Sequence, residues 1–264
     1  MMVHKTLSGK QGTVHYWVAG EGDCILFTHG ATMDHGLFQP QMDHFASSYK
    51  AITWDVPAHG LSRPYVGFSL PAAADELVKI LDAENVAQAH LVGQSMGGYI
   101  AQMVAVQHPG RARTLAAVDS SPLHASYYSW LDRWLLSVTP ALLRLYPYNL
   151  LINTIATQVA IQPAARAYAR ETLRGLSKWE IAAIMEAVYR GVVQYRRAFA
   201  LSLPVLILYG DADRTGRVQA YCKRWAAQEK KALRVIPGAA HNANMDNPAA
   251  FNQLLGEFLR TADG

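Results

Sequence analysis

The sequence predicts an α/β fold, in which a mostly parallel, doubly wound sheet carries one helical insertion. Short apolar runs alternate along the chain with segments whose apolar residues recur at helical spacing, the order expected of parallel strands linked by helices. Several runs are apolar at nearly every position, as strands covered on both faces must be. The alternation stops after position 120 and resumes near 204. We therefore expect a core domain formed by residues 1–120 and 204–264 and a helical cap at 121–203.

The first part of the chain is expected to supply four strands and three helices. Residues 13–19 alternate like an edge strand, and the glycine-containing segment 20–23 predicts a hairpin into the next strand. One helix is bounded by Ser69 as N-cap and Asn85 as a left-handed C-cap, with Pro71 near its start. The expected strands lie at 13–19, 24–28, 50–55 and in the run that ends at 92, and the expected helices at 37–47, 69–85 and 99–105.

The rest of the chain contains the insertion and the end of the sheet. Strands are expected at 114–119, 203–210 and 233–236, and helices at 219–229 and 248–259. The segment 121–203 holds nine Lys or Arg residues against four acids, a net charge of +5 in a chain whose total is +4.

The motif Gly-Gln-Ser-Met-Gly at 93–97 stands between an apolar run and a helical pattern. This order of strand, turn and helix is the context of a nucleophile elbow, where a serine on a strained turn presents its hydroxyl to substrate. Gly93 and Gly97 keep side chains out of the crowded bend. The helix that follows directs free N–H groups and its positive dipole end toward any oxyanion formed there. Ser95 is therefore the candidate nucleophile, and an incidental serine in a glycine-rich turn is the alternative.

Composition limits the classes of function. A hydrophobic fraction of 51% and a charged fraction of 17% are typical of a globular protein with a large core. The absence of a Lys/Arg-rich run argues against a nucleic-acid partner. The first ten residues lack the apolar core of a signal peptide, and Pro140 and Pro147 break the longest weakly charged segment, so we expect a cytoplasmic protein without an integral membrane segment. Cys24 and Cys222 are expected to be free thiols.

The motifs occur in an order that resembles the α/β-hydrolase superfamily over nearly the full chain, the cap excepted. The resemblance implies a serine hydrolase with a triad of Ser95, Asp213 and His241, in the order nucleophile, acid, histidine. Acyl transfer needs the same three groups: a hydroxyl, an imidazole that takes its proton, and a carboxylate that orients the imidazole. The resemblance rests on His29-Gly30, the loop 55–62, the Ser95 motif, Gly210-Asp211-Ala212-Asp213 and Gly238-Ala239-Ala240-His241.

The acid of the triad has two competitors. Asp213 is third after Gly210, where the family's acid is expected, but Asp211 is its neighbour. Asp119 follows an earlier strand, at a position that some relatives use.

The resemblance also implies an oxyanion hole built from two backbone N–H groups, those of Ala31 and Met96. His29 is expected to brace its loop through hydrogen bonds. The loop 55–62 is expected to be structural, and Ala58 stands where the family often has glycine.

Several features narrow the chemistry. A serine nucleophile argues against the haloalkane dehalogenases and epoxide hydrolases of this fold, which use aspartate. No His, Cys and carboxylate cluster has metal-ligand spacing, so we expect neither a metal nor an organic cofactor.

The leading hypothesis is hydrolysis of a small apolar carboxylic ester, lactone or thioester through an acyl-enzyme. Carbon–carbon bond hydrolysis of a diketone or meta-cleavage type substrate is one alternative, and a non-catalytic ligand receptor is another. The cap is expected to line an apolar acyl pocket, with Trp130, Trp134 and Tyr128 as substrate-binding candidates. Its arginines are expected either to bind a substrate carboxylate or to solvate the outer face.

Overall fold

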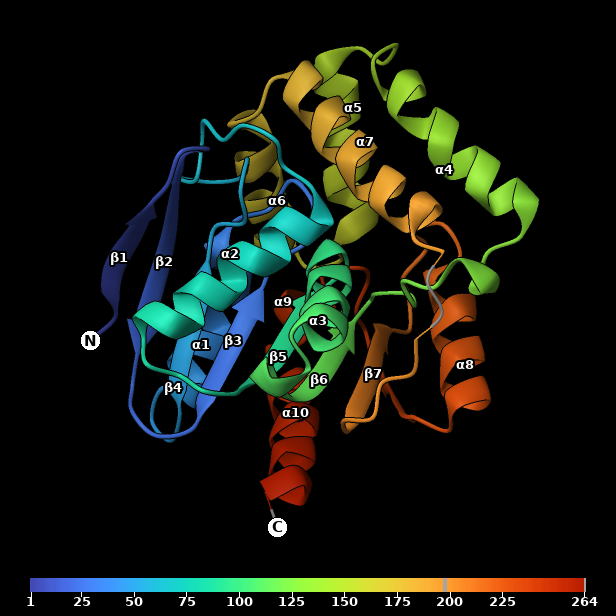
Figure 1. Ribbon diagram of the computed structural model, residues 1–264. Helices are drawn as coiled ribbons and strands as arrows, with labels where there is room; N and C mark the ends of the chain where they lie inside the picture. Colours follow the sequence, from blue (N-terminus) through green and yellow to red (C-terminus); the bar gives the residue numbers. More distant parts are fainter. Residues whose placement is uncertain (197–198, 264) are drawn as a thin grey trace.

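A computed structural model, which describes residues 1–196 and 199–263, confirms the predicted α/β class. Eight strands form one sheet in the order β1-β2-β4-β3-β5-β6-β7-β8 (Figure 1). β2 is antiparallel to both of its neighbours, and the pairs from β4 to β8 are parallel. The strands are β1 (Val3–Ser8), β2 (Thr13–Ala19), β3 (Cys24–Thr28), β4 (Lys50–Trp54), β5 (Ala89–Gln94), β6 (Ala112–Val118), β7 (Val205–Gly210) and β8 (Ala232–Ile236).

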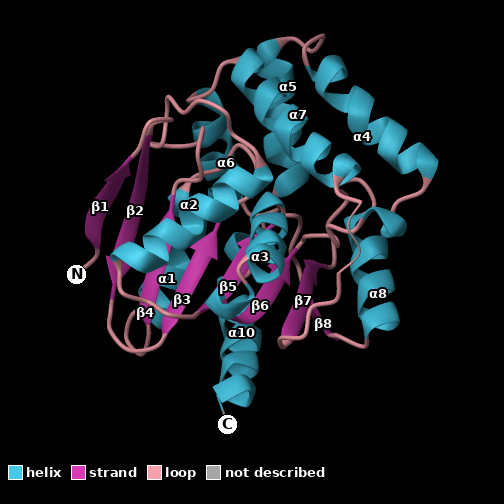
Figure 2. Ribbon diagram, in the orientation of Figure 1, coloured by secondary structure: helices cyan, strands magenta, loops and turns pink. Residues whose placement is uncertain are grey.

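Helices cover both faces of the sheet, as Figure 2 shows. α2 (Leu70–Ala83), α3 (Met96–Gln107) and α8 (Val218–Glu229) share one apolar core with the sheet. α1 (Gln39–Phe45), α9 (Ala243–Asp246) and α10 (Pro248–Asp263) share the core on the opposite face. Every residue of β3, β5 and β7 is buried because helices pack against both sides of these strands.

The edge of the sheet differs from the sequence prediction. β1, which the pattern did not predict, forms one edge of the sheet, so β2 is an inner strand rather than the expected edge strand. The hairpin predicted at 20–23 is also wrong, because β4 lies between β2 and β3 in the sheet. The physical reason is that β1 is almost wholly exposed and therefore has no apolar pattern, while the position of β4 depends on long-range pairing.

The helix boundaries follow local chemistry. The Ser69 hydroxyl accepts a hydrogen bond from Ala72 N at the start of α2, and Asn85 ends the helix with a left-handed φ of 54°. The helix expected at 37–47 is divided into a short 3₁₀ turn, His35–Phe38, and α1, which begins beside Pro40.

The segment between β6 and β7 is helical in its described part. After a 3₁₀ turn at Ala125–Tyr127 come four helices: α4 (Trp130–Leu143), α5 (Tyr148–Val159), α6 (Pro163–Arg174) and α7 (Lys178–Gln194). Figure 1 shows α4, α5 and α7 beyond the end of the sheet toward which the β3 arrow points, so they lie over the carboxyl ends of the parallel strands. Within residues 1–196 and 199–263, no helix has the length and apolarity needed to cross a membrane.

Candidate active site

Ser95 occupies the sharp turn between β5 and α3. Its backbone has φ 49° and ψ −114°, a conformation that side-chain-bearing residues rarely adopt. A β-carbon on Gly93 would collide with Gly97, and one on Gly97 would collide with the Thr28 carbonyl. The turn is held by Ser95 N, which donates to Val118 O at 2.8 Å. The two glycines of the motif are thus needed because backbone segments approach each other closely around the serine.

The structure brings the three predicted triad residues together. His241 Nε2 lies 2.9 Å from Ser95 Oγ, and His241 Nδ1 lies 3.0 Å from Asp213 Oδ2. Asp213 and His241 are each only 6% exposed, whereas Ser95 is partly open to the cavity described below. These distances allow the imidazole to take the serine proton while the carboxylate stabilises the resulting cation.

Asp213 is held as an anion by its surroundings. Burial favours the neutral acid, but the charge of His241 and its hydrogen bond outweigh burial and lower the pKa of Asp213. Thr215 N also donates to Asp213 Oδ1 at 2.8 Å. The competitor Asp211 is exposed and accepts from Ala239 N instead of contacting the imidazole.

Asp119 lies beside Asp213 and His241 of the triad. Its Oδ1 accepts from Gly210 N at 2.8 Å, and burial, followed by the charge of Asp213, raises its pKa well above the ordinary value. Carboxylate or imidazole atoms of Asp119, Asp213 and His241 lie within 4.8 Å of one another, the spacing of a possible metal site among the described residues. Both ring nitrogens of His241 already face other side chains, Nδ1 that of Asp213 and Nε2 that of Ser95. The cluster that has the spacing of a metal site is therefore also arranged for proton transfer.

The expected oxyanion donors lie at the same end of the sheet. Met96 is the first residue of α3, where a helical N–H has no partner within the helix. Ala31 lines the cavity that contains Ser95. His29 Nδ1 is 2.7 Å from Gly30 O, and its Nε2 accepts from Val56 N at 3.0 Å, so this ring is a neutral brace. Burial lowers the pKa of His29, which agrees with a neutral ring.

Sequence reasoning missed two residues that position the histidine loop. The buried Gln94, next to the nucleophile, donates from Nε2 to His241 O at 2.7 Å. Asp246 accepts from Ala240 N at 2.9 Å and, through its other oxygen, from Gln162 N at 2.9 Å. Asp246 therefore joins the histidine loop to the helical segment. The only sequence signal was their position beside the Ser95 and His241 motifs.

A cavity of about 450 Å³ lies over the triad, between the sheet and the helices α4, α5 and α7. Its lining includes Ser95 and His241, and Tyr128 lines it as expected. The aliphatic side chains of α4, α5 and α7 that line it include Leu135, Leu136, Leu143, Ile155, Val159, Met185, Val188 and Val192.

Trp130 and Trp134, the other two substrate-binding candidates, do not line this cavity. Their exposed fractions are 73% and 55%, because they project from the outer face of α4. Leu136 and Leu143 on the same helix line the cavity instead. The expectation for the two tryptophans was wrong in position because α4 is apolar on both its inner and outer faces.

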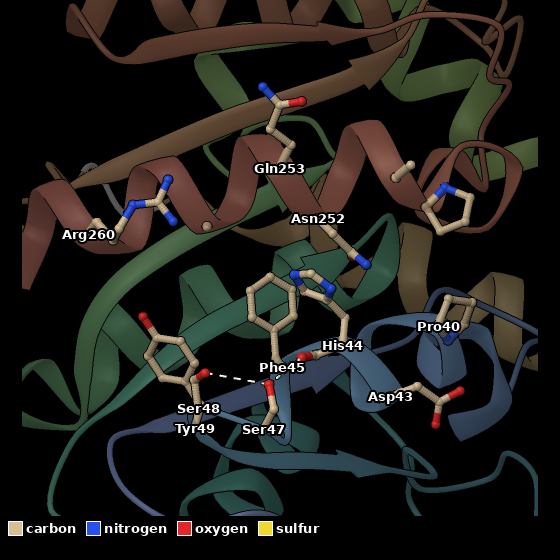
Figure 3. Close-up of a pocket in the computed structure, with 13 residues that line it drawn as sticks. Pro40, Asp43, His44, Phe45, Ser47, Ser48, Tyr49, Asn252, Gln253 and Arg260 are labelled. Carbon is tan, nitrogen blue, oxygen red and sulfur yellow. Dashed lines mark hydrogen bonds between the residues drawn. The ribbon is translucent and has the colours of Figure 1, made fainter.

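A second hollow lies away from the triad, between α1 and α10 (Figure 3). It has a volume of about 950 Å³ and is lined by residues such as Pro40, Phe45 and Arg260. None of the catalytic candidates lines it, so the candidate active site is the cavity under α4, α5 and α7.

Comparison with known proteins agrees with this geometry. The chain is 28% identical to a pimeloyl-[acyl-carrier protein] methyl ester esterase of Yersinia enterocolitica, over 94% of this chain and 98% of that protein. It is 25% identical to 3-oxoadipate enol-lactonase 1 of Acinetobacter baylyi, over 90% of this chain and 88% of that protein. The structure of a thermophilic esterase from Thermogutta terrifontis superposes with a TM-score of 0.82 at 21% identity, covering 99% of both chains. A model of the α/β-hydrolase fold matches residues 23–248, and the chain belongs to this family.

Proposed function

We propose that the protein hydrolyses carboxylic esters through an acyl-enzyme on Ser95. The observation that carries this proposal is the continuous chain of contacts from Asp213 through His241 to Ser95, with distances of 3.0 and 2.9 Å. In the first step, Ser95 Oγ attacks the ester carbonyl as His241 Nε2 takes its proton. The protonated imidazole then gives that proton to the departing alcohol.

The backbone N–H groups of Ala31 and Met96 are proposed to hold the oxyanion formed during this attack. Met96 N–H is free of helical partners, and the positive end of α3 favours negative charge at this point. Water then hydrolyses the acyl-enzyme, with His241 acting as base.

We further propose that residues 121–203 form a cap and that the acyl group occupies the apolar cavity beneath it. Leucine, isoleucine and valine side chains from α4, α5 and α7 surround the space above Ser95. Such a lining favours a neutral, apolar acyl chain. The relatives that are named as esterases and a lactonase support this reaction class.

The alternatives receive less support from the described residues. A receptor needs no proton-transfer geometry, whereas Ser95 and His241 are already spaced for it. Carbon–carbon hydrolysis of an anionic diketone would profit from a cap arginine in the cavity, but no described arginine of the cap lines it. Arg144 and Arg190 pair with Glu186 on the exposed side, and Arg197 lies outside the described residues.

The direct test is hydrolysis of p-nitrophenyl butyrate, with the Ser95→Ala protein as the blank. We expect the wild type to turn the ester over and the variant to lose about 10⁴- to 10⁶-fold in turnover. Mass spectrometry after treatment with an organophosphonate should locate the label on Ser95. Labelling of another serine, or an active Ser95→Ala protein, would contradict the mechanism.

A further inference from the structure

Three hydroxyl groups form a hydrogen-bonded chain at the wall of the substrate cavity. Tyr99 lies one helical turn beyond Ser95 on α3, and Ser121 and Tyr128 lie just after β6; all three line the cavity. Tyr99 Oη is 2.6 Å from Ser121 Oγ, which is 2.7 Å from Tyr128 Oη. Tyr128 Oη in turn donates to the carbonyl oxygen of Pro122 at 2.7 Å. The chain therefore leads from the cavity to a backbone acceptor.

The carbonyl at the end fixes the direction of every proton in this chain. A carbonyl oxygen only accepts, so the Tyr128 proton must lie between Tyr128 and Pro122. The short contact between Ser121 and Tyr128 then has to use the serine proton, since the phenol has no other. By the same reasoning the contact between Tyr99 and Ser121 uses the Tyr99 proton. Tyr99 Oη thus has no proton left for the cavity and keeps only acceptor capacity.

The backbone around Ser121 is held in place, and with it the Pro122 carbonyl that sets the direction of the three hydrogen bonds. Gln102 is fully buried, and its Nε2 donates to both Gly98 O and Ser121 O at 3.1 Å. Its Oε1 accepts from Leu123 N at 2.8 Å. One amide side chain thereby ties the segment after β6 to α3, the helix that carries Tyr99.

Both phenols keep their protons at neutral pH. Burial raises the pKa of Tyr99 and, well above the ordinary value, that of Tyr128. Neither oxygen is therefore a phenolate, and the count of one proton for each hydroxyl holds.

We propose that Tyr99 Oη is a dedicated hydrogen-bond acceptor in the cavity and that the preferred ester carries a donor, a hydroxyl or an amide N–H, that binds to it. This inference rests on the ester hydrolysis proposed above and adds a substrate class to it. Tyr99 is four residues from Ser95, a rise of about 6 Å along the helix, so the donor lies several bonds from the reacting carbonyl.

A substrate carboxylate is disfavoured at the same place. It would bring acceptor atoms against the lone pairs of Tyr99, with no proton between them. Arg217 is the only arginine or lysine among the described residues that line the cavity, and it lies 3.4 Å from Asp132. The positive charge of Arg217 is thus already paired with a carboxylate.

Matched pairs of p-nitrophenyl esters test the acceptor role. One pair is the 6-hydroxyhexanoate and the 6-methoxyhexanoate, which differ in the presence of a donor. The other pairs are acetamido esters and their N-methyl amides, built on propanoate, butanoate and pentanoate so that the donor is moved along the cavity. The quantity measured is the ratio of kcat/KM within each pair, because a general loss of activity cancels in this ratio.

The wild type should prefer the donor-bearing member of at least one pair by about three- to tenfold, the effect of one hydrogen bond. Tyr99→Phe should bring that ratio close to one. Ser121→Ala should lower the ratio, because it removes one of the two hydroxyl partners, Ser121 and Tyr128, that hold the Tyr99 proton away from the cavity. Tyr189→Phe removes another tyrosine hydroxyl from the cavity lining and serves as the matched control, with the ratio unchanged.

The possible failures are distinguishable. A wild type that hydrolyses plain p-nitrophenyl hexanoate but shows no donor preference in any pair overturns the acceptor role and leaves the ester hydrolase in place. A ratio that survives in Tyr99→Phe likewise overturns it. A wild type that hydrolyses none of the esters contradicts the proposed function, and the inference with it. Thermal melting of each variant shows whether it is folded.

Discussion

Asp119 and Asp213 place buried carboxylate oxygens within 4.8 Å of each other, although they follow two different strands of the sheet. Two carboxylates this close in a site without solvent do not both ionise readily. Asp213 has the imidazole of His241 as its partner, and its pKa is lowered, whereas the pKa of Asp119 is raised. The pair therefore consists of one anion, Asp213, and one neutral acid, Asp119.

This assignment predicts opposite results for the same substitution at the two positions. Asp213→Asn removes the charge that stabilises the His241 cation, and we expect a loss of about 10³- to 10⁴-fold in kcat. Asp119→Asn replaces a neutral acid by a neutral amide, whose oxygen can still accept from Gly210 N. We expect that variant to stay within about tenfold of the wild type, because Asn keeps the shorter backbone bond, from Gly210 N, and loses only the 3.4 Å contact from Ala243 N to Oδ2.

The measurement is kcat for one simple ester in both variants, and Asp211→Asn is the control on the same loop as Asp213. Asp211 contacts Ala239 N and not the imidazole, so its loss should affect kcat far less than that of Asp213. If Asp119→Asn were the inactive protein, the catalytic acid would belong to the earlier strand.

The neutral state of Asp119 also predicts a pH dependence of stability. Its pKa is raised in the folded protein, so its contribution to the free energy of unfolding is complete below the ordinary value of 3.8 and is lost as pH rises through the folded pKa. Asp119→Asn has no such loss. The variant should thus gain stability relative to the wild type as pH rises above 3.8 toward the raised folded pKa of Asp119, as measured by urea unfolding.

The pH dependence of stability that comes from Asp213 has the opposite sign to that from Asp119. The pKa of Asp213 is lowered, so its contribution is present above 3.8 and is lost as pH falls through the folded pKa. Because both proteins keep Asp213, this decline should be common to the wild type and Asp119→Asn. A constant difference between the two proteins across the whole pH range would contradict a neutral Asp119.

The sequence predicted most of the sheet and named Ser95, Asp213 and His241, which the structure brings together. Strands buried on both faces, such as β5 and β7, leave continuous apolar runs, and the elbow needs glycines that are visible as a motif. The choice among Asp119, Asp211 and Asp213 required the structure, because the sequence does not show which carboxylate reaches His241 Nδ1.

Two other features could not be predicted, for different physical reasons. The exposed strand β1 buries so little that its sequence has no periodic pattern. The helix α4 is apolar on both its inner and outer faces, so periodicity does not show which face lines the cavity. Trp130 and Trp134 were placed on the wrong side for this reason, while Leu136 was passed over.

The two faces of α4 provide a matched test of the acyl pocket. Leu136 lines the cavity and Trp134, two residues earlier, is 55% exposed. Each buried methylene contributes about 0.8 kcal/mol, so the wild type should favour p-nitrophenyl octanoate over butyrate. Leu136→Ala should reduce this preference about three- to tenfold, since it removes apolar surface that contacts the longer chain. Trp134→Ala should leave the ratio of kcat/KM values unchanged. The reverse outcome would place the acyl chain on the outer face of α4.

The loop after β4 offers a prediction about stability that is independent of catalysis. Ala58 has a left-handed φ of 68°, the conformation that glycine adopts without steric cost. The left-handed conformation costs an L-residue about 1–2 kcal/mol. Glycine also loses more entropy on folding, which opposes the gain by about 0.4–1 kcal/mol. Ala58→Gly should therefore raise the free energy of unfolding by about 0.5–1 kcal/mol, or Tm by about 2 °C.

Ala167→Gly, at an exposed position inside α6, is the control and should lower stability by about 1 kcal/mol. Equal destabilisation by both substitutions would show that the Ala58 conformation carries no strain.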